Sequence, residues 1–174
     1  MRLYLVRHPR PRVAPGVCYG RLDLELAEPA SAAAARISSQ LPPGLPLWSS
    51  PARRCRELAE ALHPAPRTDV RLWEMDFGQW EGRSWDEIGP AALDGWAADP
   101  AGFVPPGGES GLQVQARALA FVDELQAAGL AAAILVTHAG IMRALLAYQQ
   151  QLPGHRWLAL RFGYEEVLML RWPA

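Results

Sequence analysis

The sequence predicts an α/β fold, with a mostly parallel β-sheet and helices on its faces. Three observations support this prediction. Short apolar segments rich in β-prone residues alternate along the chain with longer segments of helical character. Hydrophobic residues make up 50% of the 174 residues, enough for a substantial core. No repeat, linker or change of composition interrupts the alternation, so we expect a single domain over residues 1–174.

The first half of the chain is expected to contain three strands and two helices. Residues 2–6 are a short apolar run before a Pro-rich stretch, which predicts a buried strand leading into an irregular segment over residues 9–28. Prolines near the first turn favour helices over residues 29–40 and from about residue 51 to residue 62, the second capped by Ser49 or Ser50. Residues 45–48 and 70–73 are strand candidates.

The second half continues the alternation. Ser84 and Glu87 have the spacing of a capping box, so a helix is expected to begin there, and Ser110 can cap a long helix ending near Ala128. Residues 132–136 are strongly apolar and predict a strand, followed by a helix over about 140–150. Two final strands are expected near 156–161 and 166–171.

Composition excludes several kinds of chemistry. All 17 cationic side chains are arginines, because the sequence has no lysine, and this rules out Schiff-base lysines and Walker-type phosphate loops. Cys18 and Cys55 are the two cysteines, and they lack metal-ligand spacing, so neither a disulfide nor a zinc site is expected. The net charge of −1 without a basic stripe argues against nucleic acid as a partner. The absence of a long apolar stretch or signal-peptide pattern predicts a cytoplasmic protein without a membrane association.

Two histidines are expected at equivalent places in the sheet. His8 follows the first strand, directly after Arg7, and His138 follows the strand over residues 132–136. Ligands of open α/β sheets bind beyond the carboxyl ends of the strands, so both imidazoles should lie at the binding edge. Arg54 is expected near the same edge in the first turns of its helix, and Glu74 follows the candidate strand 70–73.

This set of side chains suits phosphoryl transfer. Guanidinium and imidazolium groups can surround a phosphate with directed donors, a second imidazole can attack phosphorus, and a carboxylic acid can protonate the departing oxygen. Arg53 and Arg56 are alternatives to Arg54, and Asp76 and Glu81 are alternatives to Glu74.

Five motifs in sequence make the chain resemble the histidine phosphatase superfamily, also called phosphoglycerate mutase-like. They are Arg7-His8-Pro9, Ser49-Ser50-Pro51 followed by Arg54, Leu72 to Gly82 (LWEMDFGQWEG), Pro106 to Ser110 (PGGES), and Val136 to Gly140 (VTHAG). The resemblance covers nearly the whole chain, and the family fold it implies is a three-layer sandwich with helices on both sides of the sheet.

The resemblance implies a role for each matching residue. His8 would be the nucleophile, and Glu74 would be the proton donor that later activates water. Arg7, Arg54 and His138 would form the phosphate pocket, with His138 also counted among the catalytic residues. The resemblance implies neither a cofactor nor a metal, and a small phosphorylated molecule as substrate for a monomer or homodimer.

Three positions depart from the family pattern. Pro9 replaces the usual Gly after the nucleophile, Pro11 replaces a Ser or Thr, and Ala14 stands where an Asn is often found. Pro9 fixes φ and removes a backbone donor. Pro11 has no hydroxyl, so a hydroxyl partner for phosphate is missing, and Arg10 or Tyr19 are candidates to compensate.

Several functions remain open within this resemblance. The preferred one is an α-ribazole-5′-phosphate phosphatase of cobalamin biosynthesis, based on the compact size and the segment from Gly16 through Tyr19 to Gly20. Tyr19, Gly20 and Arg10 are accordingly expected near the substrate cleft. Alternatives are a sugar-phosphate or nucleotide phosphatase, a phosphoglycerate mutase, which would need a closing lid, and a catalytically weak phosphate-binding module. Trp80, Trp85 and Arg143 are either structural or border the cleft.

Overall fold

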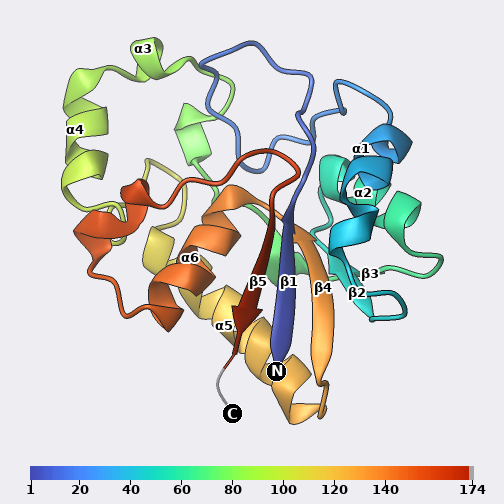
Figure 1. Ribbon diagram of the computed structural model, residues 1–174. Coiled ribbons are helices and arrows are strands. Elements are labelled where there is room, and N and C mark those ends of the chain that lie inside the picture. The colour runs from blue at the N-terminus through green and yellow to red at the C-terminus, as the bar shows by residue number, and fades with distance from the viewer. Residues whose placement is uncertain (173–174) are drawn as a thin grey trace.

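The computed structural model describes residues 1–172 and is built on a five-stranded sheet with the order β3-β2-β4-β1-β5 (Figure 1). The strands are β1 (Arg2–Arg7), β2 (Leu47–Ser49), β3 (Arg67–Thr68), β4 (Ala132–Thr137) and β5 (Val167–Arg171). Four of them are parallel, and β5 pairs antiparallel with β1 at one edge. The predicted α/β fold with a mostly parallel sheet is confirmed.

Strand β1 lies between β4 and β5, and its register determines where the histidines are. Arg7 pairs with Thr137, the last residue of β4, so both parallel strands end at the same level. The backbone N–H of His8 then donates to the carbonyl of Thr137 at 3.0 Å. His8 and His138, each one residue beyond its strand, therefore leave the sheet side by side at its carboxyl edge.

Helices cover both faces of the sheet, which gives the three layers (Figure 1). Helices α5 (Gly111–Ala127) and α6 (Ala139–Gln149) bury one core against Leu3, Leu5 and Leu135. Helices α1 (Ala30–Ile37) and α2 (Arg53–Leu62) bury the other against Val6 and Val136. Residues from alternate positions of β1 and β4 thus enter opposite cores, as the two-residue period of a strand requires.

Two short helices, α3 (Trp85–Ile88) and α4 (Pro90–Ala98), lie above the carboxyl edge of the sheet (Figure 1). Ser84 and Glu87 form the predicted capping box at the start of α3. Gly89 adopts φ +88° between the two helices, which ends the first and allows Pro90 to begin the second. The capping box of Ser110 and Gln113 likewise begins α5.

Two of the predicted strands are wrong. Residues 70–72 form a 3₁₀ turn (η2, Val70–Leu72), because the Asp69 carboxylate accepts from the Arg71 backbone N–H at 2.8 Å and caps a helical start. The neighbouring strand is instead β3. Residues 156–159 belong to another 3₁₀ segment (η4, Gly154–Ala159), which follows Pro153 and buries Trp157. Two further short 3₁₀ turns are η1 (Ser38–Gln40) and η3 (Gly78–Trp80).

The segment over residues 9–28 is irregular, as predicted, and runs over the carboxyl edge of the sheet (Figure 1). Isolated bridges hold it in place, between Pro11 and Leu26 within the segment and between Val17 and Ser84 at the start of α3. None of the helices in residues 1–172 combines the length and apolar character needed to cross a lipid bilayer.

Candidate active site

His8 lies at the centre of the site and has one fully defined hydrogen bond. Its side chain is 1% exposed, and its Nδ1 lies 2.7 Å from the carbonyl oxygen of Pro9. A carbonyl can only accept, so Nδ1 is the protonated nitrogen and Nε2 has the free lone pair in the neutral ring. Burial lowers the pKa of His8 well below its ordinary value, and the nearby Arg54 lowers it further. His8 is therefore a neutral imidazole with Nε2 available.

Arg54 is the largest fully buried side chain among the described residues, with 0% exposure. It comes from the first turn of α2, and its Nη1 and Nη2 each donate at 2.7 Å to backbone carbonyls, those of Leu22 and Gly20. Its Nε donates to His8 Nε2 at 3.4 Å. Two carbonyls from the 9–28 segment thus hold a buried cation against the unprotonated nitrogen of His8.

His138 lies on the other side of Arg54. Arg54 Nη2 is 3.2 Å from His138 Nδ1, and since a guanidinium can only donate, Nδ1 is the acceptor. The opposite nitrogen, Nε2, then donates to Ser50 Oγ at 2.8 Å. Burial, followed by Arg54 and His8, lowers the pKa of His138 well below its ordinary value. The two histidine rings meet edge to face with centroids 5.1 Å apart.

Arg7 is held from the opposite side, by the segment that precedes β5. Its Nη1 donates to the carbonyl of Phe162 at 2.6 Å, and its guanidinium lies 4.0 Å from the centre of the Tyr164 ring. Its Nε is buried and has no hydrogen-bond partner among the described residues. Arg7 Nε is therefore an unpaired donor on the residue next to His8.

Glu74 reaches the site from the loop after η2. Its Oε1 accepts from the backbone N–H of Met75 at 2.9 Å, and its Oε2 accepts from that of Gly140 at 3.1 Å. A Cβ on Gly140 would lie 2.0 Å from Oε1, so any larger residue at position 140 would have to displace this carboxyl group. The competing carboxylates are used elsewhere, since Asp76 accepts from Gly78 and Glu81 accepts from the backbone of Arg21 and Leu22.

These groups meet at a cavity of about 350 Å³. Its lining includes Arg7, His8, Arg10, Tyr19, Glu74, Trp85, Trp96, Arg143 and Tyr164, together with the loop over residues 13–17 and Phe77. Arg54 and His138 do not line it but lie buried directly behind His8. The structure thus brings all five predicted groups together, in two layers: Arg7, His8 and Glu74 at the cavity, Arg54 and His138 beneath.

The predicted cleft residues divide in the same way. Arg10 and Tyr19 line the cavity, whereas Gly20 lies outside the lining and contributes its carbonyl to Arg54. The hydroxyl of Tyr19 lies 2.8 Å from that of Tyr164, which links the 9–28 segment to the segment before β5. Burial raises the pKa of Tyr19 above its ordinary value, and the hydrogen bond with Tyr164 raises it further, so this phenol stays protonated.

Sequence reasoning missed several residues of the site. Ser50 belongs to the Ser49-Ser50-Pro51 motif, but its place in the site could not be predicted, because it depends on the contact with His138 that the fold creates. Tyr164 and Trp96 had no local signal, because each lies in an element that lacks a motif. Of the two tryptophans that could be structural or border the cleft, Trp85 lines the cavity, whereas Trp80 is 3% exposed and lies outside the lining.

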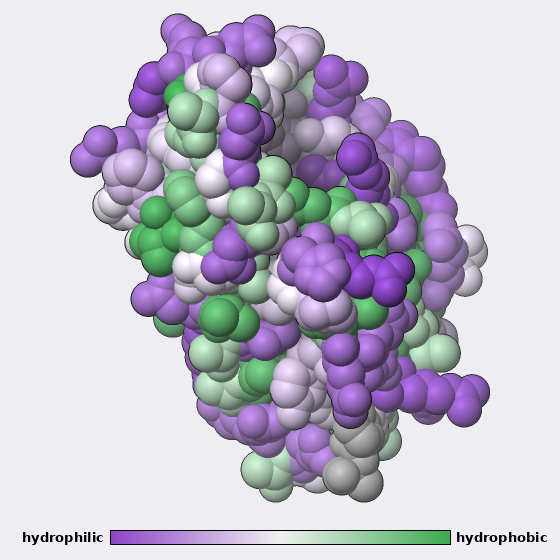
Figure 2. All heavy atoms as spheres, turned by 90° about the vertical axis from the view of Figure 1, so that its left-hand side faces the viewer, coloured by the Kyte–Doolittle hydropathy of each residue, from purple (hydrophilic) through white to green (hydrophobic). Residues whose placement is uncertain are grey.

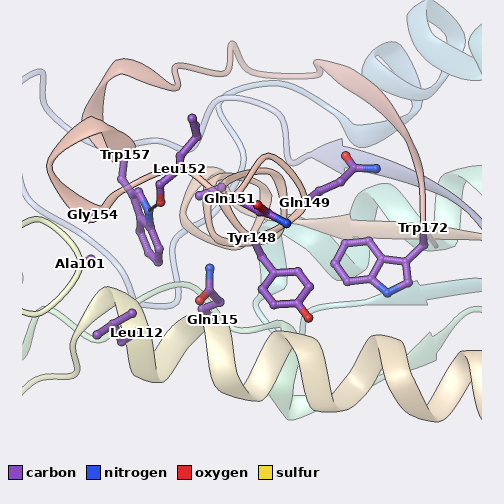
Figure 3. Close-up of a pocket in the computed structure, with 11 residues that line it drawn as sticks. Ala101, Leu112, Gln115, Tyr148, Gln149, Gln151, Leu152, Gly154, Trp157 and Trp172 are labelled. Atoms are coloured by element: carbon purple, nitrogen blue, oxygen red, sulfur yellow. Dashed lines mark hydrogen bonds between the residues drawn. The ribbon is translucent and has the colours of Figure 1, made fainter. Parts of the chain in front are cut away.

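A larger cavity of about 530 Å³ lies away from the histidines, between the start of α5 and the end of α6 (Figure 3). Figure 3 shows Leu112 and Gln115 on one side and Tyr148 with Trp172 on the other. The part of its lining that falls within residues 1–172 contains no charged side chain and no histidine. Seen as a whole, the face in Figure 2 mixes scattered apolar side chains with polar ones. The smaller cavity holds the titratable groups and is the candidate active site.

No cluster of three or more His, Cys, Asp or Glu side chains suited to a metal ion occurs within residues 1–172. Cys55 Sγ lies 3.6 Å from His138 Nε2, but burial raises the pKa of this thiol to about 12. Cys55 is therefore a protonated packing residue beside the histidine.

Comparison with known proteins agrees with the motifs. A family model described as the histidine phosphatase superfamily (branch 1) matches residues 3–174. The chain is 35% identical to the glucosyl-3-phosphoglycerate phosphatase of Mycobacterium tuberculosis, in an alignment that covers 91% of this chain and 79% of that protein. It is 30% identical to the putative phosphoserine phosphatase 2 of Hydrogenobacter thermophilus, with 83% and 76% covered.

Solved structures give the same result. A mycobacterial glucosyl-3-phosphoglycerate phosphatase in complex with inorganic phosphate superposes with a TM-score of 0.84 at 34% identity, over 98% of this chain and 89% of that one. The native form of the mycobacterial enzyme superposes with a TM-score of 0.85 at 33% identity, over 97% and 88% of the two chains.

Proposed function

Because this chain belongs to the histidine phosphatase superfamily, we propose that it hydrolyses small phosphate monoesters of the sugar-phosphate class through a phosphohistidine on His8. The single observation on which this depends is the state of His8: a buried, neutral imidazole whose Nδ1–H is held by Pro9 and whose Nε2 faces Arg54. The replacement of Gly by Pro at position 9 leaves this contact intact, since it uses the Pro9 carbonyl and not the missing N–H.

In the first step, His8 Nε2 attacks phosphorus and the bond to the leaving oxygen breaks. Arg7 Nε, which has no other partner, donates to a phosphoryl oxygen, and Arg54 Nε is within reach of a phosphoryl group on Nε2. These cationic donors stabilise the charge that develops on the transferred group without a metal ion. His138 is a positioning residue, which holds Arg54 and Ser50 in place from behind.

Glu74 handles the protons in both steps. Its carboxyl group protonates the leaving oxygen, and the carboxylate that results is stabilised by the N–H groups of Met75 and Gly140. In the second step this carboxylate takes a proton from water, the hydroxide attacks phosphorus, and the bond to His8 Nε2 breaks. Inorganic phosphate and a neutral His8 are released.

The relatives favour one substrate class over the others. A glucosyl-3-phosphoglycerate phosphatase and a putative phosphoserine phosphatase match over most of the chain. The first name supports the sugar-phosphate alternative, and neither name supports α-ribazole 5′-phosphate. We therefore expect a small phosphorylated metabolite as substrate and no nucleic-acid partner.

The test is phosphate release from a panel of monoesters in the presence of EDTA. The panel contains glucosyl-3-phosphoglycerate, 3-phosphoglycerate, phosphoserine, α-ribazole 5′-phosphate and a nitrophenyl ester. We expect turnover by the wild type and a loss of at least about 10³-fold in His8→Ala, the scale seen when a nucleophile is removed. Rapid acid-free quenching should trap phosphate on the wild-type chain only.

The matched control is His155→Ala, which removes a histidine outside the site and should leave turnover intact. Near-normal turnover by His8→Ala contradicts the proposal. If the wild type binds phosphate but hydrolyses none of the esters, the chain is a phosphate-binding module, the alternative suggested by Pro9 and Pro11.

A further inference from the structure

The motif from Pro106 to Ser110 has no part in the reaction described above, although it packs against the loop that carries Glu74. A Cβ on Gly108 would overlap the carbonyl oxygen of Asp76, so the two backbones are in close contact. The backbone N–H of Glu109 donates to the same carbonyl at 2.9 Å. The motif is therefore fitted to the chain just after Glu74.

Glu74 lies in a stretch without regular structure. Residues 73–77 belong to neither a helix nor a strand, so their backbone carbonyls need partners from elsewhere. Arg117, from α5, supplies several of these partners. Its Nη1 donates to the carbonyls of Arg71 at 2.6 Å and Trp73 at 2.7 Å, and its Nη2 donates to that of Glu74 at 3.1 Å. One guanidinium thus holds three carbonyls of the loop.

Arg21 donates to the same carbonyl of Glu74, through its Nε at 3.1 Å. Glu109 joins the two arginines, because its Oε1 accepts from Arg117 Nη2 at 2.7 Å and from Arg21 Nη2 at 3.3 Å. The same oxygen accepts from the backbone N–H of Asp76 at 3.0 Å. Burial alone would raise the pKa of Glu109, but the hydrogen bond and charge of Arg117 lower it below its ordinary value, so Glu109 is a carboxylate.

Arg21, Glu109 and Arg117 together form what we call the loop clamp. The side chains of Arg117 and Glu109 are 17% and 16% exposed, so solvent screens this ion pair weakly. The clamp fixes the backbone of Glu74, while the N–H groups of Met75 and Gly140 hold its carboxyl group. Misplacement of a reacting group by about 1 Å is enough to slow a reaction strongly.

We propose that the loop clamp positions the carboxyl group of Glu74 for proton transfer to the leaving oxygen. Arg21, Glu109 and Arg117 are positioning residues, since they act through Glu74 and contact it at its backbone or through its neighbours. This inference rests on the proposed function, in which Glu74 is the proton donor, and it gives the motif from Pro106 to Ser110 a role.

Two esters with different leaving oxygens distinguish positioning from folding. A nitrophenolate leaves as a stable anion, whereas the alkoxide of 3-phosphoglycerate needs a proton. We compare kcat/KM for 3-phosphoglycerate with kcat/KM for nitrophenyl phosphate, because kcat/KM reports the steps up to the transfer to His8 and a loss of folded enzyme cancels in the ratio. Glu74→Gln should lower this ratio by about 10²-fold, and Arg117→Gln should lower it by about tenfold.

Glu109→Gln keeps the shape of the side chain and removes its charge, and it should lower the ratio as well. The matched control is Arg71→Gln, which removes an arginine of the same loop that pairs with Asp69 and Glu124, and it should leave the ratio unchanged. An unchanged ratio in both Arg117→Gln and Glu109→Gln overturns the proposal.

A double variant shows whether Arg117 acts through Glu74. Once Glu74→Gln has removed the proton donor, adding Arg117→Gln should not lower the ratio further. A further fall of about tenfold overturns the proposal, because Arg117 would then affect the leaving oxygen by another route.

Failure of the proposed function has a different signature, namely that neither ester is hydrolysed or that Glu74→Gln leaves the ratio unchanged. Amide hydrogen exchange then decides the question without turnover. The N–H groups of Met75 and Gly140 should exchange at least about tenfold faster in Arg117→Gln than in Arg71→Gln, relative to the Leu135 amide in β4, which corrects for overall stability. Equal relative rates in the two variants overturn the loop clamp.

Discussion

The two ends of the active-site cavity are built differently. At the phosphate end, Arg54 and His138 are 0% exposed, and their contacts with Ser50, Gly20 and Leu22 leave little freedom. At the other end, Trp96 Nε1 and the two Nη groups of Arg143 have no partner within residues 1–172, in walls supplied by the short helix α4 and by α6. Within residues 1–172, the phosphate end has one unpaired donor, Arg7 Nε, beside groups that are already hydrogen-bonded, whereas the other end has unpaired donors on both Trp96 and Arg143.

This difference suggests that one end of the cavity serves the reaction itself and the other serves the recognition of the substrate. Donors that are fixed in advance stabilise the transferred group at no cost of reorganisation, and this requirement is the same for every phosphate monoester. Donors that wait for the leaving group discriminate between substrates, because the wrong leaving group leaves them unpaired. Substitutions at the first end should therefore affect all substrates, and substitutions at the second should affect some.

The largest effect is expected at the most buried group of the phosphate end. Arg54→Lys keeps the charge but cannot bond both carbonyls and both histidines, so kcat should fall by about 10²- to 10³-fold for every ester. Arg53→Lys is the matched control, because the neighbouring Arg53 forms exposed ion pairs with Glu25 and Glu57. Equal losses of kcat in the two variants would contradict the assignment of this role to Arg54 rather than to Arg53.

A loss of about 10²-fold is expected from Gly140→Ala. The added Cβ would lie 2.0 Å from Glu74 Oε1 and must displace the carboxyl group, and misplacement of a reacting group by about 1 Å has an effect of this size. The check is a double-mutant cycle with Glu74→Gln, measured as kcat. If Gly140→Ala still lowers kcat by the full factor in the Glu74→Gln background, the glycine acts by another route.

The neutral histidines of the phosphate end should make stability depend on pH. Burial lowers the pKa of both His8 and His138, whereas in the unfolded chain each protonates near pH 6.5. Below that pH the unfolded chain binds protons that the folded chain does not, so the free energy of unfolding should fall by about 1.4 kcal/mol per pH unit for each histidine. Above pH 6.5 this contribution is fully present.

Urea unfolding between pH 5 and pH 7.5 measures this slope. His8→Gln should reduce it by the share of one histidine. A slope that is unchanged in His8→Gln would mean that other groups cause the pH dependence.

The smallest effect is expected at the pair of tyrosine hydroxyls in the cavity lining, Tyr19 and Tyr164. Tyr164→Phe removes the hydroxyl pair with Tyr19 but keeps the ring over Arg7, so KM should rise by about two- to fivefold with kcat little changed. Tyr19→Phe should do the same, and the double variant should be no worse than either one. Additive losses would indicate that each hydroxyl contacts the ligand separately.

The sequence predicted the phosphate end better than the other end, for a physical reason. His8, Arg54 and His138 follow strands or begin a helix, and strand ends converge at one edge of a parallel sheet. Trp96 lies in α4, whose sequence lacks the strong hydrophobic periodicity that predicts a helix. Its position depends on the break at Gly89 and on packing against Phe77 and Trp85.

The two wrong strand predictions have the same cause, namely contacts between segments that the local sequence does not contain. The alternation of apolar residues over 156–161 is typical of a strand, but the sheet edge is occupied by β5, and Pro153 directs the chain into 3₁₀ turns that bury Trp157. At residues 70–72, one side-chain cap from Asp69 decides between strand and turn. The local sequence pattern predicts neither outcome, because each depends on which neighbouring group forms hydrogen bonds with the backbone of the segment.

The position of β1 also affects how the protein is made. Strand β1, which ends one residue before His8, is the first of the five strands to be synthesised, but its two neighbours in the sheet, β4 and β5, are the last of the five, with Arg2 paired to Ala132 and Arg171. On the ribosome, a nascent chain that stops before β4 therefore has the proposed nucleophile His8 next to an unpaired strand. Long-range pairing of this kind slows folding. The candidate active site is assembled only when β4 and β5 have emerged, so chains that stop before them should be inactive and exposed to aggregation at the edges of β1.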